Sequence, residues 1–354
     1  MRHINQLAWT FGCCLALICV TGVAQEDAKT KNEERLKQLL KRYPEADANK
    51  DGTLTEAEAQ AYRAKLAGKQ PRKQQGEMPE PTKANVAYGK HERQVLDFWQ
   101  AKSEKPTPVV VYIHGGGFVG GDKRSIPGAL AQACLDAGIS VAAIHYRFAT
   151  TDIFPASQQD GARAIQYLRS KSDEWNIDPT RFAAFGGSAG AGISMWLAFH
   201  DDMADPKSED PVARQSTRLQ AVGSMGGQSS YDPLVIKEWI GGRAYLHPSM
   251  LIVYGLKSED QMHDPKLKPL YDEVSAIKHL TKDDPPILMF YNEADAPLPE
   301  NSRPGQGIHH PIFGHKLKAE MDKLGIESLY FHASQRPNLN LEMLNFFKKH
   351  FKME

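Results

Sequence analysis

One serine lies in a turn whose spacing favours nucleophilic chemistry. The segment Gly186-Gly187-Ser188-Ala189-Gly190 joins a short apolar run, 182–185, to a run of small residues that begins at Ala191. Glycines two residues before and two residues after the serine let the backbone turn sharply from a strand into a helix. Such a turn raises the serine hydroxyl over the N-terminus of the helix, where free N–H groups favour a developing oxyanion. The pattern is typical of a nucleophile elbow, and an ordinary glycine-rich turn is its alternative.

A second glycine-rich turn lies upstream, in His114-Gly115-Gly116-Gly117-Phe118. It follows a continuous β-branched and aromatic run, 109–114, which predicts a buried strand. Backbone N–H groups in such a turn can point into a site and hold an oxyanion. A tight loop without chemistry would explain this segment alone. Two such turns, each at the end of a predicted strand, favour one shared site.

The segments that must position these turns alternate between strand-like and helix-like patterns from Asn85 onward. Besides 109–114 and the strand before Ser188, we predict strands at 140–146, 287–291 and 328–332, and helices at 127–137, 156–171, 313–324 and 341–351. The alternation predicts an α/β fold, with a mostly parallel sheet and helices on both faces.

Several further segments accompany the two turns: Tyr146-Arg147, Phe154-Pro155-Ala156, Asp160 and 175–181. As a set they resemble the α/β-hydrolase superfamily, in particular bacterial esterases of the hormone-sensitive-lipase-like and feruloyl-esterase-like groups, from residue 85 to the C-terminus. The resemblance implies that Ser188 is the nucleophile. It also implies an oxyanion hole made by the N–H groups of Gly115, Gly116, Gly117 and Ala189.

The acid of a catalytic triad is expected after the predicted strand 287–291. Asp295 holds the place where such esterases carry the acid, four residues before Pro299, and Glu293 is the alternative. A loop-capping role would also explain Asp295.

The histidine departs from the family pattern. The loop 333–338, where the resemblance places it, contains none. His332 lies just before that loop and is the first choice of base, in the order serine, acid, histidine. His309 and His310 lie in an unusual insert, 301–313, and are the alternatives. By the same likeness His114 is structural, and a serine without a base would be a weak nucleophile.

Twelve residues ahead of the main domain match the pattern of a calcium-binding loop, from Asp47 to Glu58. Gly52 allows the left-handed turn, Leu54 fills the apolar eighth position, and Thr55 suits a contact through water. Apolar residues at helical spacing flank the loop on both sides: Leu36, Leu39, Leu40 and Tyr43 before it, and Ala61, Tyr62 and Leu66 after it. The segment resembles an EF-hand over 32–66. The expected ligands are the side chains of Asp47, Asn49, Asp51 and Glu58 and the backbone carbonyl of Thr53. A single hand is expected to hold Ca²⁺ weakly, as a structural or adhesive site.

The first 24 residues resemble a secretory signal, with Arg2, an uncharged run from Leu7 to Val20, and small residues up to Ala24. A secreted or periplasmic protein is therefore expected, without stable membrane insertion after cleavage. Removal of the signal would leave one cysteine, Cys134, in an apolar, alanine-rich helix as a buried small hydrophobe. The expected organisation is a signal peptide at 1–24, an EF-hand module at 25–67, a linker at 68–84 and a hydrolase domain at 85–354.

Lys and Arg together number 43, as do Asp and Glu, so the charge balance favours neither nucleic acid nor an anionic membrane as partner. The leading hypothesis is a secreted serine esterase that needs no cofactor for catalysis and forms an acyl-enzyme. Its substrate would be a small ester or an ester on a polysaccharide, such as an acetyl or feruloyl group. Aromatic residues between 227 and 284 are expected in a cap or pocket wall. The rival hypothesis is a non-catalytic hydrolase relative, attached or stabilised through its calcium hand.

Overall fold

The computed structural model describes residues 36–37, 40–41, 43–55, 58–59, 62 and 78–353. The chain divides into two compact units, Met1–Gln74 and Gln75–Glu354, each of which is described by itself. The predicted signal peptide, 1–24, lies outside the described residues. In the part of the chain that the structure describes, no helix is long and apolar enough to cross a membrane.

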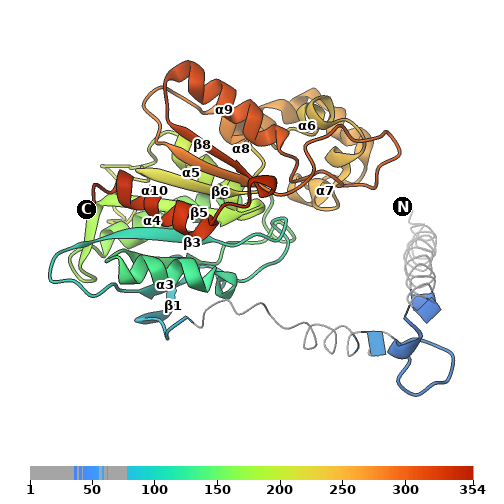
Figure 1. The fold of residues 1–354 in the computed structure, drawn as a ribbon, viewed down its shortest axis with the longest axis horizontal. Coiled ribbons are helices and arrows are strands. Elements are labelled where there is room, and N and C mark those ends of the chain that lie inside the picture. Colours follow the sequence, from blue (N-terminus) through green and yellow to red (C-terminus); the bar gives the residue numbers. More distant parts are fainter. Residues whose placement is uncertain are drawn as a thin grey trace, which may run out of the picture. The chain divides into compact units, whose positions relative to one another are not determined.

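An eight-stranded sheet forms the centre of the second unit (Figure 1). Its strands are β1 (Lys83–Ala87), β2 (Val95–Trp99), β3 (Thr107–Ile113), β4 (Ser140–Ile144), β5 (Ile177–Gly187), β6 (Ala221–Met225), β7 (Ile287–Tyr291) and β8 (Ser328–His332). Their order is β1-β2-β4-β3-β5-β6-β7-β8. The pairs β1–β2 and β2–β4 are antiparallel, and all others are parallel. The predicted α/β fold with a mostly parallel sheet is confirmed.

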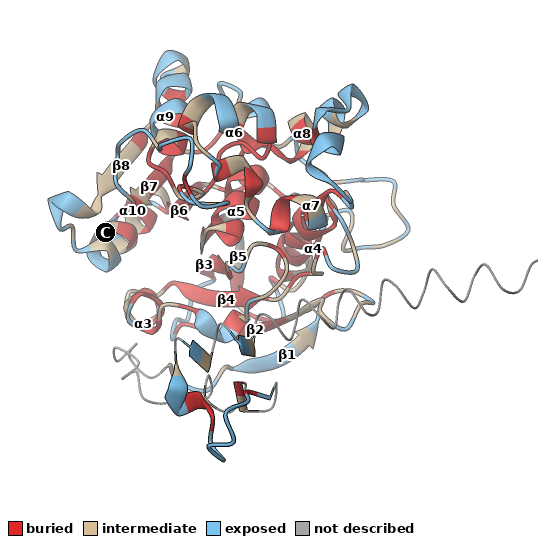
Figure 2. Cartoon of the chain, turned by 90° about the vertical axis from the view of Figure 1, so that its right-hand side faces the viewer, coloured by how far each residue is buried: buried red, intermediate tan, exposed pale blue. Residues whose placement is uncertain are grey.

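Helices cover both faces of this sheet because its central strands are apolar on both sides. Along β3, Val109 and Val111 face one core and Val110 and Tyr112 the other. On one face lie α3 (Gly128–Asp136) and α10 (Leu339–His350), and on the other lie α4 (Ala156–Ser170), α5 (Ala189–Phe199) and α9 (Ile312–Leu324). Every residue of α5 is buried (Figure 2), so the nucleophile turn rests on a rigid element. Cys134, in α3, is buried as predicted.

A cap of short helices joins β6 to β7. It contains α6 (Pro233–Ile240), α7 (Ser249–Val253) and α8 (Lys268–Val274), with the 3₁₀ turns η3 (Ala244–Leu246), η4 (Glu259–His263), η5 (Pro265–Leu267) and η6 (Ala276–Lys278). Further 3₁₀ turns are η1 (Pro44–Ala46), η2 (Lys123–Ser125) and η7 (Ala333–Gln335). Tyr254 and Tyr271 are buried within the cap and pack edge to face, 4.8 Å apart between ring centres, whereas Tyr231 lines a cavity.

The sequence predicts five of the eight strands and misses β6 and the edge formed by β1 and β2. The predicted strands 287–291 and 328–332 match β7 and β8. β1 and β2 were not predicted: β1 is mostly exposed and has no apolar pattern, and Asp97 interrupts the short apolar run of β2. β1 begins inside the predicted linker, and Trp99 Nε1 donates to Pro79 O at 2.7 Å. The linker boundary at residue 84 is therefore wrong, and the second unit begins before it.

The calcium-loop segment has a small core of its own in the first unit. Leu54, Ala46 and Ala59 are buried in it, and four partly buried side chains pack around them: Leu36, Leu40, Tyr43 and Tyr62. These include the apolar positions predicted to flank the loop on each side. Leu39, Ala61 and Leu66, predicted with them, lie outside the described residues.

Candidate active site

Ser188 lies between β5 and α5 in a strained backbone conformation. Its φ of 52° and ψ of −121° are rarely adopted by a residue with a side chain. A Cβ at Gly190 would lie 2.0 Å from Ile113 O, and a Cβ at Gly186 would lie 2.5 Å from the same atom. The turn therefore crosses the end of β3 so closely that only glycine fits at both positions. The strain and close packing are those of a nucleophile elbow.

The glycine loop after β3 faces this turn. Gly116 and Gly117 have φ values of 119° and 60°. Among the described residues, no acceptor is found for the N–H groups of Gly116, Gly117 or Ala189, and all three residues line the same cavity as Ser188. Gly115 lies behind them, and a Cβ there would come within 2.7 Å of Gly187 O. Three of the four predicted oxyanion residues thus meet at the serine, and Gly115 holds the two loops together.

His114 supports this loop from within the core. Its Nδ1–H donates to Gly115 O at 2.7 Å, and its ring stacks on Tyr146 at 4.4 Å. Burial lowers the pKa of His114 to about 4, so the ring is neutral near pH 7. These contacts agree with the structural role expected for His114.

His309 is the histidine that contacts Ser188. Its Nε2 lies 2.8 Å from Ser188 Oγ, and its Nδ1 lies 3.3 Å from Glu293 Oε1. A carboxylate beside Nδ1 selects the tautomer with the proton on that nitrogen, which leaves the Nε2 lone pair to accept the hydroxyl proton. Ser188, Glu293 and His309 follow one another in the chain order of a hydrolase triad.

The insert that carries His309 is held by hydrogen bonds to its backbone. Gln228 Nε2 donates to Ile308 O at 2.7 Å, and Tyr231 donates to Gln228 Oε1 at 3.0 Å. His310 Nε2 donates to Ala296 O at 3.0 Å, and His310 Nδ1 accepts from Ile312 N at 3.0 Å. Both nitrogens of the buried His310 therefore support the insert, and its neighbour His309 is the one that faces the serine.

The expected contact between His332 and Ser188 is wrong. His332 Nε2 donates to the backbone carbonyl of Glu293 at 2.9 Å, and its Nδ1 lies 2.8 Å from Ser334 Oγ. Both ring nitrogens are therefore occupied. The parallel register of β7 and β8 pairs His332 with Tyr291, two residues before Glu293, so His332 supports the acid loop and does not reach the elbow.

The first choice of acid is also corrected. Asp295 Oδ2 lies 2.7 Å from His315 Nε2 in an exposed pair, and His315 stacks on Tyr330. Glu293, the alternative, faces His309 instead. The signal for His309 was present in the sequence as a histidine between the acid and the last strand. No local feature separated it from the adjacent His310, because only the folded insert decides which ring faces inward.

Two cavities meet at this site. The first has a volume of about 500 Å³, contains Ser188 and the oxyanion glycines, and is walled by apolar residues such as Phe118, Met250 and Val253. The second has a volume of about 800 Å³ and lies beside Glu293, with Arg303 and Gln306 in its wall. Both are lined by His247, Pro248, Ile308 and His309. A molecule bound at Ser188 can therefore extend into two different spaces.

His247 presents a hydrogen-bond donor where the cavities meet. Its Nδ1 lies 2.7 Å from Ser249 Oγ and accepts from Ser249 N at 3.3 Å, so the ring proton is on Nε2. A Cβ at Gly117 would be 3.5 Å from His247 Cε1, which places the ring beside the oxyanion loop. Burial, and then the neighbouring His309, lower the pKa of His247 and keep it neutral.

The oxygen-rich loop of the first unit fits a hard cation. Asp47 accepts N–H groups from Lys50 at 2.7 Å and Gly52 at 2.9 Å, which curls the loop around its own carboxylates. Gly52 has the predicted positive φ, 81°. The Thr55 hydroxyl and, more weakly, the N–H groups of Asn49 and Ala48 lower the pKa of Glu58, whose carboxylate therefore reaches back across the loop. The donors are all oxygens, which suits Ca²⁺.

Comparison with known proteins identifies the family. A family model described as BD-FAE matches residues 96–303, more than half of the chain. The chain belongs to the BD-FAE family. This is an α/β-hydrolase esterase family. The match includes Ser188 and Glu293 and ends before His309, so the histidine of this BD-FAE chain lies in the part that the family model does not match.

Related sequences are named as esterases. The BD-FAE chain is 27% identical over 217 residues to Esterase LipC of Mycobacterium tuberculosis, covering 60% of this chain and 51% of that protein. It is 27% identical over 193 residues to the ethyl acetate hydrolase of Pseudomonas putida, covering 52% and 55%. The chain spans about half the length of the curated relatives it matches.

Solved structures share the fold at low identity. The acetyl ester-xyloside bifunctional hydrolase from Caldicellulosiruptor lactoaceticus aligns with a TM-score of 0.61 and 19% identity, covering 79% of this chain and 100% of that one. A truncated carbohydrate esterase from gut microbiota aligns with a TM-score of 0.57 and 19% identity, covering 76% and 96%.

Proposed function

We propose that this BD-FAE domain hydrolyses carboxylic esters through an acyl-enzyme. Ser188 attacks the ester carbonyl, and His309 accepts its proton and returns it to the leaving alcohol. Glu293 orients His309 and stabilises the imidazolium, while N–H groups of Gly116, Gly117 and Ala189 hold the oxyanion. The 2.8 Å contact between His309 Nε2 and Ser188 Oγ carries the proposal.

Turnover of p-nitrophenyl acetate by the purified chain and by Ser188→Ala tests this mechanism. We expect the variant to lose at least about 10⁴-fold in kcat/KM, because no other group supplies the nucleophile. A fluorophosphonate should add one equivalent to the wild type on Ser188 and none to the variant. Turnover that survives Ser188→Ala would exclude the acyl-enzyme. A wild type that neither hydrolyses esters nor reacts with the fluorophosphonate would favour a non-catalytic binding protein.

We further propose that the substrate is an acetyl or feruloyl ester of a carbohydrate. The names of the two structural neighbours support this class. The apolar cavity around Ser188 suits the acyl group, and the more polar second cavity suits a sugar. His247 Nε2–H, at their junction, would then donate to a hydroxyl of the alcohol part.

Kinetics on paired substrates test the carbohydrate assignment. With acetylated xylo-oligosaccharide, His247→Phe should raise KM about tenfold and leave kcat within about twofold, because a hydrogen bond to substrate is lost. With p-nitrophenyl acetate, which has no sugar hydroxyl, both constants should change little. His247→Gln, which keeps a donor nitrogen, should restore part of the loss. Equal effects on both substrates would contradict the contact while leaving the esterase mechanism standing.

We also infer that the loop Asp47–Glu58 binds Ca²⁺ as a structural site. Asp47, Asn49, Asp51 and Glu58 would hold the ion with the carbonyl of Thr53. Calorimetry should show millimolar-range binding that disappears in Glu58→Gln and persists in Glu56→Gln, a position that the ligand pattern does not use. Binding unchanged in Glu58→Gln would contradict the site.

Export is the remaining proposal and rests on residues 1–24. The mature protein recovered outside the cytoplasm should begin at Gln25, as N-terminal sequencing would show. A mature chain that retains Arg2 would contradict cleavage.

A further inference from the structure

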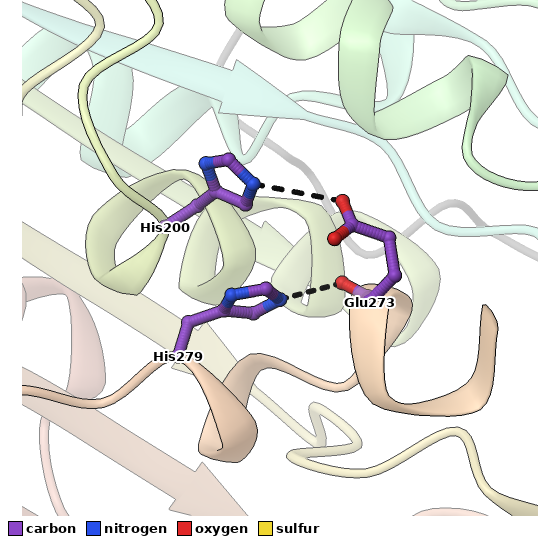
Figure 3. A group of neighbouring side chains, drawn as sticks. All are labelled: His200, Glu273 and His279. Carbon is purple, nitrogen blue, oxygen red and sulfur yellow. Dashed lines mark hydrogen bonds and ion pairs between the residues drawn. The ribbon is translucent and has the colours of Figure 1, made fainter. Parts of the chain in front are cut away.

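Two histidines and a glutamate meet at the end of α5 that is farthest from Ser188 (Figure 3). Ser188 caps the N-terminus of α5 and His200 its C-terminus. Glu273 lies in α8, and His279 follows η6. His200 Nε2 lies 3.5 Å from Glu273 Oε1, and one ligand atom from each of the three residues lies within 4.8 Å of the others.

The hydrogen bonds of His200 leave one nitrogen for a cation. Its Nδ1 donates to Asp201 O at 2.9 Å, so its Nε2 faces the Glu273 carboxylate. Without a second proton, that lone pair and the carboxylate repel each other, and a bound cation removes the repulsion. Histidines that bind metals usually donate their other N–H to a carbonyl in this way. The Trp196 ring, 4.2 Å from the His200 ring, fixes its orientation.

His279 can exchange its present contact for a metal at little cost. Its Nε2 donates to Glu273 O at 2.6 Å, but the same carbonyl also accepts from Trp196 Nε1 at 2.8 Å. The carbonyl therefore keeps a donor when His279 takes the tautomer with its proton on Nδ1, which frees the Nε2 lone pair for a metal. Figure 3 shows both imidazoles directing a nitrogen toward Glu273.

We propose that His200, Glu273 and His279 bind a divalent transition metal such as Zn²⁺. Ligand atoms of a tetrahedral zinc site lie about 3.3 Å apart, since each is about 2.0–2.1 Å from the metal. The His200–Glu273 pair already has nearly this spacing at 3.5 Å, and since all three ligand atoms lie within 4.8 Å of one another, His279 has to approach by about 1.5 Å at most. Two imidazoles and one carboxylate suit zinc, and water completes the fourth position. The ion would tie the end of α5 to the cap, remote from the catalytic serine.

Zinc titration of the untagged full-length chain tests the site, with Ca²⁺ present to saturate the acidic loop. We expect one zinc per chain by calorimetry, a higher melting temperature with zinc, and visible absorption bands when Co²⁺ replaces it. His200→Ala and His279→Ala should each weaken zinc binding at least about tenfold, and Glu273→Gln similarly. His315→Ala, which removes an exposed histidine that also faces a carboxylate, is the matched control and should bind as the wild type does.

Three results would overturn the proposal. The first is that the wild type binds no zinc. The second is that both His200→Ala and His279→Ala bind zinc within twofold of the wild-type affinity. The third is that zinc binding is lost in His309→Ala instead. If an alanine variant melts at a lower temperature than the wild type without metal, His279→Gln provides a milder replacement. Zinc should raise the melting temperature of His279→Gln less than that of the wild type, and an equal rise would contradict the site. Ester turnover of His200→Ala, His279→Ala and Glu273→Gln without zinc should match the wild type, which separates this proposal from the proposed function.

Discussion

The two halves of the candidate site are built in different ways. The serine and oxyanion half lies where β5 and β3 end, and backbone crossings too close for any side chain hold it together: a Cβ at Gly190 would stand 2.0 Å from Ile113 O. The acid and base half lies in the loops after β7, where side-chain hydrogen bonds from Gln228 and His310 hold an insert in place.

This difference explains why one half has a sequence signature and the other does not. A backbone crossing admits only glycine, so the requirement appears as a fixed local pattern. A loop held by side chains can be built from many sequences, and the histidine can come from any loop that reaches the serine. Four experiments test this difference.

The largest effect should separate the two candidate bases. His309→Ala should lower kcat/KM about 10⁴-fold, since the serine loses its proton acceptor. His332→Ala removes a hydrogen bond to the Glu293 backbone and should cost about tenfold or less. Ester turnover of both variants at the same pH measures this contrast. A greater loss in His332→Ala would restore the original choice of base.

A second contrast compares the two acids. Glu293→Gln should lower kcat about 10²–10⁴-fold, because the His309 tautomer and its imidazolium lose their carboxylate. Asp295→Asn disturbs only the exposed pair with His315 and should stay within about threefold of wild type. Parallel kcat measurements decide between them, and equal losses would leave neither carboxylate assigned.

A third test measures how the glycines of the elbow affect the free energy of unfolding. Gly190→Ala should destabilise the fold by about 2–4 kcal/mol, since its Cβ meets backbone atoms that cannot move away. Gly187→Ala is the matched control: its Cβ has nothing closer than Met225 O at 3.8 Å, and its cost should stay below about 1 kcal/mol. Urea unfolding of both variants measures the difference. Equal urea midpoints for the two variants would show that the backbone at Gly190 leaves room for a side chain.

The smallest effect concerns the pH dependence of stability beside the oxyanion loop. The pKa of His114 falls from its ordinary 6.5 to about 4 in the folded protein, so between these values the unfolded chain binds more protons. Stability is therefore lost as the pH falls from 6.5 toward 4, by up to about 1.4 kcal/mol per pH unit. His114→Asn keeps a donor for Gly115 O and does not titrate.

Urea midpoints at pH 7.5 and pH 5 should differ less in His114→Asn than in the wild type. Burial also lowers the pKa of His145 to about 4, so some dependence should remain. An unchanged slope in the variant would show that His114 does not titrate in this range.

The sequence predicted the parts of the fold whose burial leaves a periodic pattern. β7 has the predicted bounds because it is a continuous apolar and aromatic run, and β8 because Leu329, Tyr330 and Phe331 form such a run at its centre. β6 was not predicted, since Ala221–Met225 contains a glycine and a serine and is buried only because β5 and β7 enclose it. The antiparallel edge formed by β1 and β2 was missed for the reason given above.

The α/β class was predictable from the alternation of strand-like and helix-like segments. The Ser188 elbow and the glycine loop were predictable because close backbone crossings require glycine at fixed positions. The sequence narrowed the acid to Glu293 or Asp295 and the base to three histidines. Selecting Glu293 and His309 among these candidates required the folded structure. That choice depends on how the insert 301–313 packs beside Ser188 and on the partners that His332 and Asp295 contact instead. These are long-range contacts that no local spacing encodes.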